Sequence, residues 1–270
     1  MEESKLFFEQ DAEKKNEWRR ENKKGRDMSG WVAQNREYFK QNDGSQAVTE
    51  LREAFDIFYV DGENSRLPCI NNENRNAFQD LAHESIELAT RLLRCLSLAL
   101  NKKIHFFENL HRRMLSGNNK TSLRSLYYPP IKENVESGSI RCGEHTDYGT
   151  LTFLYQDKYP GLQVKTVTDG WISVPPRPGL LMVNIGDMLE MWTNQLYSAT
   201  FHRVVIPDEE IERKEARQSI AFFLHPDDQV MIEPLVAEIN EEKQKKGETT
   251  YSSVSALQHS AKRFSESFKY

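Results

Sequence analysis

The sequence predicts a mostly β fold with α-helices, in which a helical part packs against an antiparallel sandwich or jelly roll. Two observations lead to this fold class. After residue 118, short runs rich in β-branched and aromatic residues are separated by Gly, Pro, Asn and Asp, as in antiparallel sandwiches and jelly rolls. Before that point, one long segment carries apolar residues at three- and four-residue spacing, which is the pattern of an amphipathic helix. A chain of 270 residues has ample material for one such core.

The N-terminal part, residues 1–117, is predicted to be a mainly helical covering region. Residues 1–45 are strongly polar but contain several aromatic side chains, so we expect a short helix followed by irregular structure rather than disorder. The long amphipathic helix is predicted over residues 72–102. A shorter one is predicted over residues 105–115, with Gly117 as its C-terminal stop.

Residues 118–235 are predicted to form the β core, and residues 236–270 a C-terminal extension. The extension combines a charge-dense segment, residues 238–248, with a closing helix over residues 253–268. The predicted strands of the core are residues 123–128, 139–141, 151–156, 162–167, 171–174, 180–183, 200–206, 219–224 and 230–233.

The composition limits the classes of partner. With 36 basic and 41 acidic residues the net charge is -5, so the chain offers no polycation of the kind that binds nucleic acid. No run of 18 or more apolar residues occurs, and the first residues lack the pattern of a signal peptide, so no membrane partner is expected. Three scattered cysteines argue against a disulfide framework. We expect a reducing, cytoplasmic setting and a monomeric chain.

A candidate metal site begins with His145 and Asp147. In an extended strand, residues i and i+2 point to the same face, so this imidazole and carboxylate could share one small ion. Two histidines and one carboxylate form the ligand pattern of non-heme Fe(II) sites. The pair is a weak signal until another strand supplies a third ligand.

His202 is the best candidate for that third ligand. It lies within an apolar β run, residues 199–205, where an imidazole needs a buried partner, either a hydrogen-bonding group or a metal. The terminal helix, which holds His259, is expected to lie far from the strands. The remaining histidines are expected in or beside helices or at a strand end: His83, His105, His111 and His225.

Arg217 and Ser219 also share one face of a predicted strand. A guanidinium inside a β core requires an anionic partner. One candidate is the carboxylate of a bound 2-oxo dicarboxylic acid, which Arg binds bidentately and Ser helps to hold. The alternative is an internal salt bridge to a residue such as Asp187, and spacing alone does not decide between the two.

Several motifs occur in an order that resembles a known family. They are residues 145–149 (HTDYG), 161–164 (GLQV), 171–176 (WISVPP), 183–189 (VNIGDML), 202–204 (HRV) and 217–219 (RQS). This pattern resembles the isopenicillin N synthase-like branch of the Fe(II)/2-oxoglutarate-dependent dioxygenases, and it covers nearly all of residues 72–235. The resemblance is specific for the family and not for the substrate.

The resemblance implies a double-stranded β-helix (jelly-roll) core with flanking helices. It identifies His145, Asp147 and His202 as the catalytic iron ligands, and Arg217 and Ser219 as the residues that bind the distal carboxylate of 2-oxoglutarate.

Residues 123–130 resemble the strand that precedes the first ligand in this family. Tyr128 matches a Tyr that touches the cosubstrate and is therefore a further candidate cofactor-binding residue. Leu126 departs from an Asn that is frequent in plant relatives, which puts the usual polar contact there in doubt.

The implied activity is that of a non-heme iron dioxygenase, an oxidoreductase that uses Fe(II), 2-oxoglutarate and O2. It would hydroxylate a small-molecule substrate while 2-oxoglutarate is decarboxylated to succinate and CO2, with desaturation or ring closure as variants. Two alternatives are a 2-oxo-acid-independent iron oxidase of the isopenicillin N synthase type and a non-catalytic metal-binding paralogue.

The start of the chain departs from the family pattern. Relatives usually begin with an apolar strand and helix ahead of the segment that resembles residues 3–8, and this chain shows no such lead-in. A shortened start predicts an unpaired sheet edge, exposed apolar surface and lower stability than that of full-length relatives.

A few further residues lie close to these motifs. Tyr148, Phe201 and Phe222 are candidate pocket residues, although aromatic residues in β runs mostly fill cores. Cys142 lies three residues before His145, so we expect it to face the opposite side of the strand as a small buried hydrophobe.

Overall fold

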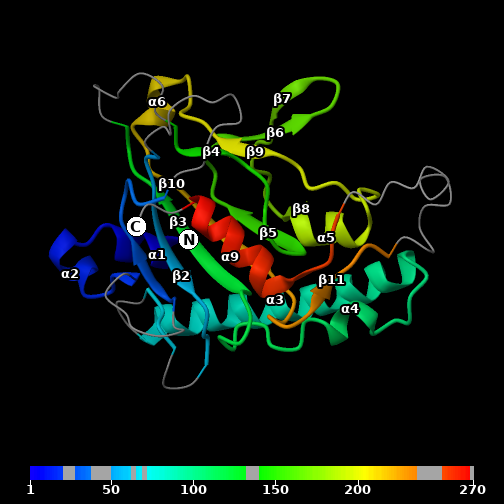
Figure 1. Ribbon diagram of the computed structural model, residues 1–270. Coiled ribbons are helices and arrows are strands. Elements are labelled where there is room, and N and C mark those ends of the chain that lie inside the picture. Colours follow the sequence, from blue (N-terminus) through cyan, green and yellow to red (C-terminus); the bar gives the residue numbers. More distant parts are fainter. Residues whose placement is uncertain are drawn as a thin grey trace.

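Two antiparallel sheets form the core, and helices cover them (Figure 1). The computed structural model describes residues 1–20, 28–37, 50–61, 65–68, 72–131, 140–235 and 251–267. The larger sheet has the order β1-β2-β3-β10-β5-β8 and the smaller one β4-β9-β6-β7. The predicted mostly β fold with flanking helices is therefore confirmed.

The strands of the larger sheet are all antiparallel to their neighbours. They are β1 (Gly30–Val32), β2 (Glu53–Ile57), β3 (Ser122–Tyr128), β10 (Arg217–Leu224), β5 (Leu151–Gln156) and β8 (Met182–Ile185). The smaller sheet consists of β4 (Cys142–His145), β9 (His202–Val204), β6 (Leu162–Thr166) and β7 (Gly170–Ser173). A separate pair joins β11 (Met231–Ile232) to β12 (Val254–Ser255).

Alternation along β10 sends its side chains to two different environments. Ile220 and Phe222 belong to the apolar core under the helices, whereas Ala221 and the partly buried Phe223 belong to a smaller cluster between the sheets. This is the period of two expected for a strand with both faces covered. The inner face of the larger sheet is therefore available to build a site.

Helix α3 (Asn72–Ala99) covers the outer face of the larger sheet, where it runs beneath the strands in Figure 1. Its buried apolar side chains recur at intervals of one or two helical turns, as an amphipathic helix requires: Phe78, Ala82, Ala89 and Leu93. The helix predicted over residues 72–102 is therefore confirmed, with its last residue at Ala99.

The other helices are short except for the C-terminal one. They are α1 (Glu2–Phe8), α2 (Ala12–Asn16), α4 (Phe106–Asn109), α5 (Asp187–Trp192), α6 (Glu210–Arg213) and α9 (Ala256–Ser267). Helix α1 is anchored by Phe7 and Phe8, which pack on Phe55 of β2 and Tyr127 of β3. No helix within the described ranges is long and apolar enough to cross a membrane.

Several boundaries differ from the prediction. The helix predicted over residues 105–115 is only the single turn of α4, and Leu115 adopts a φ of 51°, which a regular helix cannot contain. The strand predicted over residues 139–141 begins instead at Cys142. The charge-dense segment at 238–248 lies outside the described residues.

The strands β1 and β2 were not predicted. They fall within residues 1–117 and extend the larger sheet beyond β3. β2 reads Glu-Ala-Phe-Asp-Ile, so it carries a charged residue on each face and lacks a clear period of two, yet all five of its residues are buried. Its polar side chains, Glu53 among them, are paired inside the protein (Trp31 and Lys15 both contact this carboxylate), which periodicity alone does not reveal.

Candidate metal centre and active site

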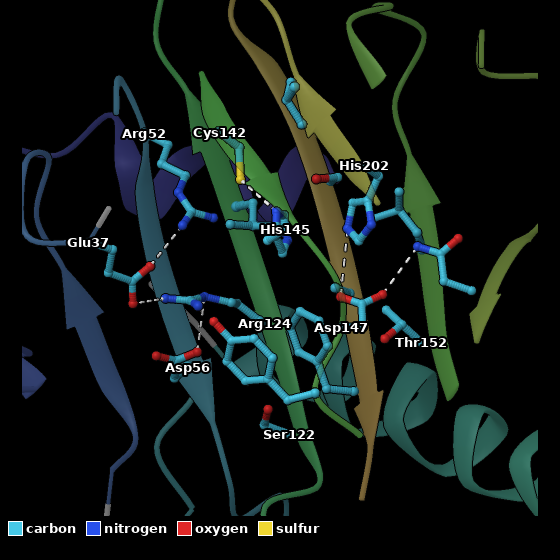
Figure 2. A pocket seen from close by; sticks show the side chains of 18 of the residues that line it. Glu37, Arg52, Asp56, Ser122, Arg124, Cys142, His145, Asp147, Thr152 and His202 are labelled. Carbon is cyan, nitrogen blue, oxygen red and sulfur yellow. Dashed lines mark hydrogen bonds and ion pairs between the residues drawn. The ribbon is translucent and has the colours of Figure 1, made fainter. Parts of the chain in front are cut away.

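Three side chains come together between the sheets: His145, Asp147 and His202. One ligand atom from each lies within 4.8 Å of the other two, a spacing that a single metal ion can bridge. His145 ends β4 and stands directly opposite His202 of β9, with ring centroids 4.2 Å apart. Asp147 follows in the turn after β4, and Figure 2 shows its carboxylate facing His202.

Backbone carbonyls orient both imidazoles. His145 Nδ1 lies 2.8 Å from the carbonyl of Gly143, and His202 Nδ1 lies 3.0 Å from the carbonyl of Thr200. Each Nδ1 therefore carries the proton and donates it to a carbonyl two residues earlier, which leaves Nε2 as the metal-binding atom. His202 Nε2 is 3.7 Å from Asp147 Oδ1.

The protonation states also suit a metal. Burial, and secondly the neighbouring His202, lower the pKa of His145 well below its ordinary value, so this imidazole is neutral. Asn184 Nδ2 donates to Asp147 Oδ2 at 3.2 Å and fixes the rotation of that carboxylate. Two imidazoles that each present Nε2 and one oriented carboxylate fit Fe(II).

Close backbone packing holds the turn that carries Asp147. The Asp187 N–H donates to the Asp147 carbonyl at 2.8 Å. A Cβ at Gly186 would lie 2.3 Å from the Gly149 carbonyl oxygen, and one at Gly149 would lie 2.3 Å from that of Leu224. Both positions therefore require glycine, and Gly186 is also the N-cap of α5.

Helix α9 contacts the same turn from the outside. Arg263 donates to Thr146 Oγ1 at 3.0 Å, lies 3.2 Å from Asp187 and stacks 4.5 Å from the Tyr148 ring centroid. His259, which was expected far from the strands, lies 3.3 Å from the Asp187 carboxylate. That expectation is wrong because α9 folds back across the sheets (Figure 1).

Arg217 is buried, and no carboxylate in the described part of the chain pairs with it. Its Nη2 donates to Gln156 Oε1 at 3.0 Å and its Nε to the Tyr159 carbonyl at 3.3 Å, and Nη1 has no hydrogen-bond partner among the described residues. The alternative of a salt bridge to Asp187 is wrong, because that carboxylate pairs with His259 and Arg263 instead. Such a guanidinium is prepared to receive an anion.

Ser219 and Tyr128 complete this end of the cavity. Ser219 lies on the same face of β10 as Arg217, and both line the cavity that contains the three metal-ligand candidates. Tyr128 stands opposite Arg217 in the β3–β10 register, with the guanidinium 5.0 Å from its ring centroid. Burial raises the pKa of Tyr128, so its phenol stays neutral. Leu126, opposite Ser219, offers only an apolar surface there.

Cys142 does not face away from His145, contrary to expectation. Between the paired positions, β4 has one residue more than β9, which marks a β-bulge. The bulge turns Cys142 onto the side of His145, where its Sγ lies 3.9 Å from Nδ1 (Figure 2). Burial raises the pKa of Cys142 to about 12, so it remains a thiol, as expected of a small buried hydrophobe.

Of the three aromatic candidates, only Tyr148 lines the cavity. Phe222 is fully buried on the other face of the sheet and stacks on Phe153, and Phe201 is 38% exposed. Phe223, the neighbour of Phe222, lines the cavity instead, as the alternation of β10 requires.

The sequence did not reveal a set of buried charges that also lines the cavity. We call it the ionic wall; it consists of Arg20, Glu37, Arg52, Asp56 and Arg124. Asp56 binds Arg20 at 2.8 Å and Arg124 at 3.2 Å. Glu37 binds Arg52 at 3.2 Å and also binds Arg124, as Figure 2 shows.

Mutual pairing keeps the ionic wall charged. Burial alone would raise the pKa of Glu37, but Arg124 and Arg52 lower it below its ordinary value. Arg52 has a second carboxylate, Glu50, at 2.9 Å. Each member comes from β2, from β3 or from segments preceding β2, so their convergence depends on the β2–β3 pairing.

Comparison with known proteins gives a consistent result. The sequence profile of the 2OG-Fe(II) oxygenase superfamily matches residues 119–226. The chain is 33% identical over 209 residues to the 2-oxoglutarate-dependent dioxygenase htyE of Aspergillus rugulosus, covering 73% of this chain and 62% of that protein. It is 34% identical over 172 residues to the homoarginine-6-hydroxylase 2-ODD-C23 of Glycine max, covering 60% of this chain and 49% of that protein.

The fold is likewise similar to that of solved structures. A full-length Neurospora crassa protein, solved in complex with alpha-KG and thymine, superposes with a TM-score of 0.80 at 25% identity, covering 98% of this chain and 81% of that one. The chain thus spans about half to just under two thirds of the length of the first two curated relatives.

Proposed function

The chain belongs to the 2OG-Fe(II) oxygenase superfamily, and from this premise we propose that it is an Fe(II)- and 2-oxoglutarate-dependent oxygenase that hydroxylates a small molecule. One observation carries the proposal. The cavity that brings His145, Asp147 and His202 within bridging distance of one ion also contains Arg217, a buried guanidinium with no carboxylate partner in the described part of the chain.

His145, Asp147 and His202 would hold the Fe(II). When bound, the iron would activate O2 for hydroxylation: one oxygen atom would enter the substrate and the other the succinate that forms, with CO2, as 2-oxoglutarate is oxidatively decarboxylated. The carbonyls of Gly143 and Thr200 accept hydrogen bonds from the Nδ1 atoms of the two imidazoles and so leave both Nε2 atoms available for the metal.

Arg217 and Ser219 would bind the distal carboxylate of 2-oxoglutarate. Gln156 and Tyr159 fix two of the guanidinium nitrogens, so the remaining Nη1 has a defined direction before the anion arrives. Tyr128 supports the guanidinium with an uncharged aromatic surface. This arrangement gives Tyr128 a role in holding Arg217, in addition to any contact with the cosubstrate.

The comparisons favour this activity over the two alternatives raised by the sequence. The curated relatives are named for 2-oxoglutarate or for hydroxylation, and the solved Neurospora crassa structures hold alpha-KG. The small molecules named for those proteins include homoarginine and thymine. A small-molecule substrate is the corresponding proposal here, and a cytoplasmic, monomeric protein stays a prediction.

Anaerobic titration of the Fe(II)-loaded protein with 2-oxoglutarate tests the proposal. We expect a visible metal-to-ligand charge-transfer band in the wild-type protein and its loss at the same cosubstrate concentration in Arg217→Ala. Arg112→Ala removes an exposed guanidinium and is the matched control, which should retain the band. A wild-type protein that binds Fe(II) but develops no band would rule out the proposed cosubstrate.

A further inference from the structure

The ionic wall is electrically balanced. With Glu50 it forms a continuous chain of alternating charges, in the order Arg20, Asp56, Arg124, Glu37, Arg52 and Glu50. Three guanidiniums face three carboxylates. A charged ligand that bound to any of these residues would therefore have to displace its present ion-pair partner.

The metal end of the cavity is balanced as well under the proposed function. The divalent metal and Arg217 supply three positive charges, and Asp147 and the dianionic cosubstrate supply three negative ones. His225 also lines the cavity, and burial lowers its pKa to about 3, so this imidazole adds no charge at neutral pH.

The cosubstrate would neutralise Arg217. Of the other Lys and Arg side chains that line the cavity, Lys120 alone has no carboxylate partner among the described residues. The polar contact of its Nζ is with the thioether Sδ of Met28, at 3.9 Å. Lys120 lies two residues before Ser122, which starts β3, so it continues the inner-face series that includes Ser122 and Arg124. Counted over the described residues, the part of the cavity left for a substrate thus carries one excess positive charge.

Aromatic side chains line the same cavity. Phe58, Tyr148, Phe223 and Phe264 all line it. Tyr148 and Phe264 form an edge-to-face pair with centroids 5.7 Å apart, so the ring on α9 closes the cavity beside the metal-binding turn. Such surfaces bind flat or apolar bodies, because aromatic rings pack well against one another and against other apolar groups.

We propose that the substrate is a small monocarboxylate with an aromatic or other apolar body, whose carboxylate is bound by Lys120. The inference rests on the proposed function. The Lys120 ammonium binds the carboxylate of the substrate, and the aromatic side chains pack around its apolar body. The charged residues of the ionic wall remain paired with one another. A neutral molecule of the same shape leaves the ammonium without a partner, and a cationic one repels it.

Isothermal titration calorimetry on the anaerobic Fe(II)/2-oxoglutarate complex tests this without turnover. The probes are three molecules of one shape: phenylacetate, phenylacetamide and phenethylamine. We expect phenylacetate to bind about 10-fold more tightly than the amide, which corresponds to about 1.4 kcal/mol, and the amine to bind most weakly. Higher salt should weaken binding of phenylacetate only.

Three variants complete the experiment. Lys120→Met keeps the length and apolar stem of the side chain and should abolish the preference for the carboxylate, whereas Lys120→Arg should preserve it. Lys103→Met removes an exposed lysine ahead of α4 and is the control.

The inference is overturned if phenylacetate fails to bind, if the amide or amine binds equally well, or if the preference survives in Lys120→Met. Absence of the 2-oxoglutarate charge-transfer band in the wild-type protein would instead refute the proposed function.

Discussion

His145 and His202 face each other across the β4–β9 pair, and each imidazole is held by the backbone carbonyl two residues before it. The two imidazoles lie on paired strands and are oriented in the same way, each by a hydrogen bond from its Nδ1 to a backbone carbonyl. Their orientation depends on main-chain atoms, which substitution of neighbouring side chains leaves in place. The third ligand differs, because a side chain, Asn184, orients Asp147.

Replacing Asn184 should therefore weaken metal binding. Asn184→Leu keeps the approximate volume but removes the 3.2 Å donor to Asp147 Oδ2, and loss of such an outer contact typically costs about 10- to 100-fold in metal affinity. Competition with a chromophoric chelator measures the effect. Asn109→Leu, at an exposed position in the turn of α4, is the control. Equal affinities in the wild-type protein and Asn184→Leu would show that the carboxylate needs no such support.

Arg217→Met should separate cosubstrate binding from metal binding. The substitution removes the donors that would meet the distal carboxylate, and charged hydrogen bonds of this kind contribute about 1.5–3 kcal/mol each. We expect the KM for 2-oxoglutarate to rise by roughly 10- to 100-fold while Fe(II) affinity changes little. A parallel loss of Fe(II) affinity would indicate that the variant disturbs the whole cavity, and Arg217→Lys then distinguishes charge from shape.

Acid should destabilise the chain through its buried neutral histidines. Burial lowers the pKa of His111 to about 4 from an ordinary value of 6.5. Between these values the unfolded chain binds the proton and the folded chain does not, so stability is complete above pH 6.5 and falls as the pH drops towards 4. Each such histidine contributes a slope of up to about 1.4 kcal/mol per pH unit.

Urea unfolding at several pH values between about 7.5 and about 4.5 checks this slope. His111→Gln should reduce it, because the amide can still reach the carbonyl of Phe107 and the hydroxyl of Thr150 but does not titrate. His83→Gln removes an exposed histidine and should leave the slope unchanged. An unaltered slope in His111→Gln would place the acid sensitivity elsewhere.

Phe222 and Phe201 should differ sharply in their effect on stability. Phe222 is 0% exposed and stacks on Phe153, so Phe222→Ala should lower the free energy of unfolding by about 3–5 kcal/mol through loss of packing and a residual cavity. Phe201 is 38% exposed, and Phe201→Ala should change it by less than about 1 kcal/mol. Denaturant titration measures both. Comparable losses would contradict the assignment of Phe222 to the core.

The sequence predicted the elements whose signal is local. The β-rich run over residues 219–224 and the helical spacing in α3 are visible in the order of residues alone, and both were found, with the strand beginning two residues earlier, at Arg217. Family resemblance added His202 and Arg217 in their order along the chain. The bulge before His145 was not predictable, because an extra residue in β4 shows only against the strand β9 that pairs with it.

The ionic wall was missed for a related reason. The sequence of β2 places a charged residue on each face, Glu53 and Asp56, and it reads the same whether these side chains face solvent or are buried and paired. Asp56 pairs with Arg124 because the two residues lie opposite each other in the β2–β3 register. Glu37 and Arg20, which also pair with these residues, belong to segments that precede both strands. Charge pairing over such separations in sequence needs the fold itself.

Arg263 should couple helix α9 to the metal site, because it contacts the turn between two of the ligand candidates. It binds Thr146, pairs with Asp187 and stacks on Tyr148. Arg263→Met removes all three contacts of the guanidinium while keeping an apolar stem. We expect faster hydrogen exchange in residues 256–267 and a several-fold loss of metal affinity, whereas Arg263→Lys should restore the charge but not the planar stacking. Lys262→Met, at an exposed position on the same helix, is the control. If Arg263→Met loosens α9 but leaves the metal affinity of the wild-type protein intact, the helix closes the cavity without supporting the ligand geometry.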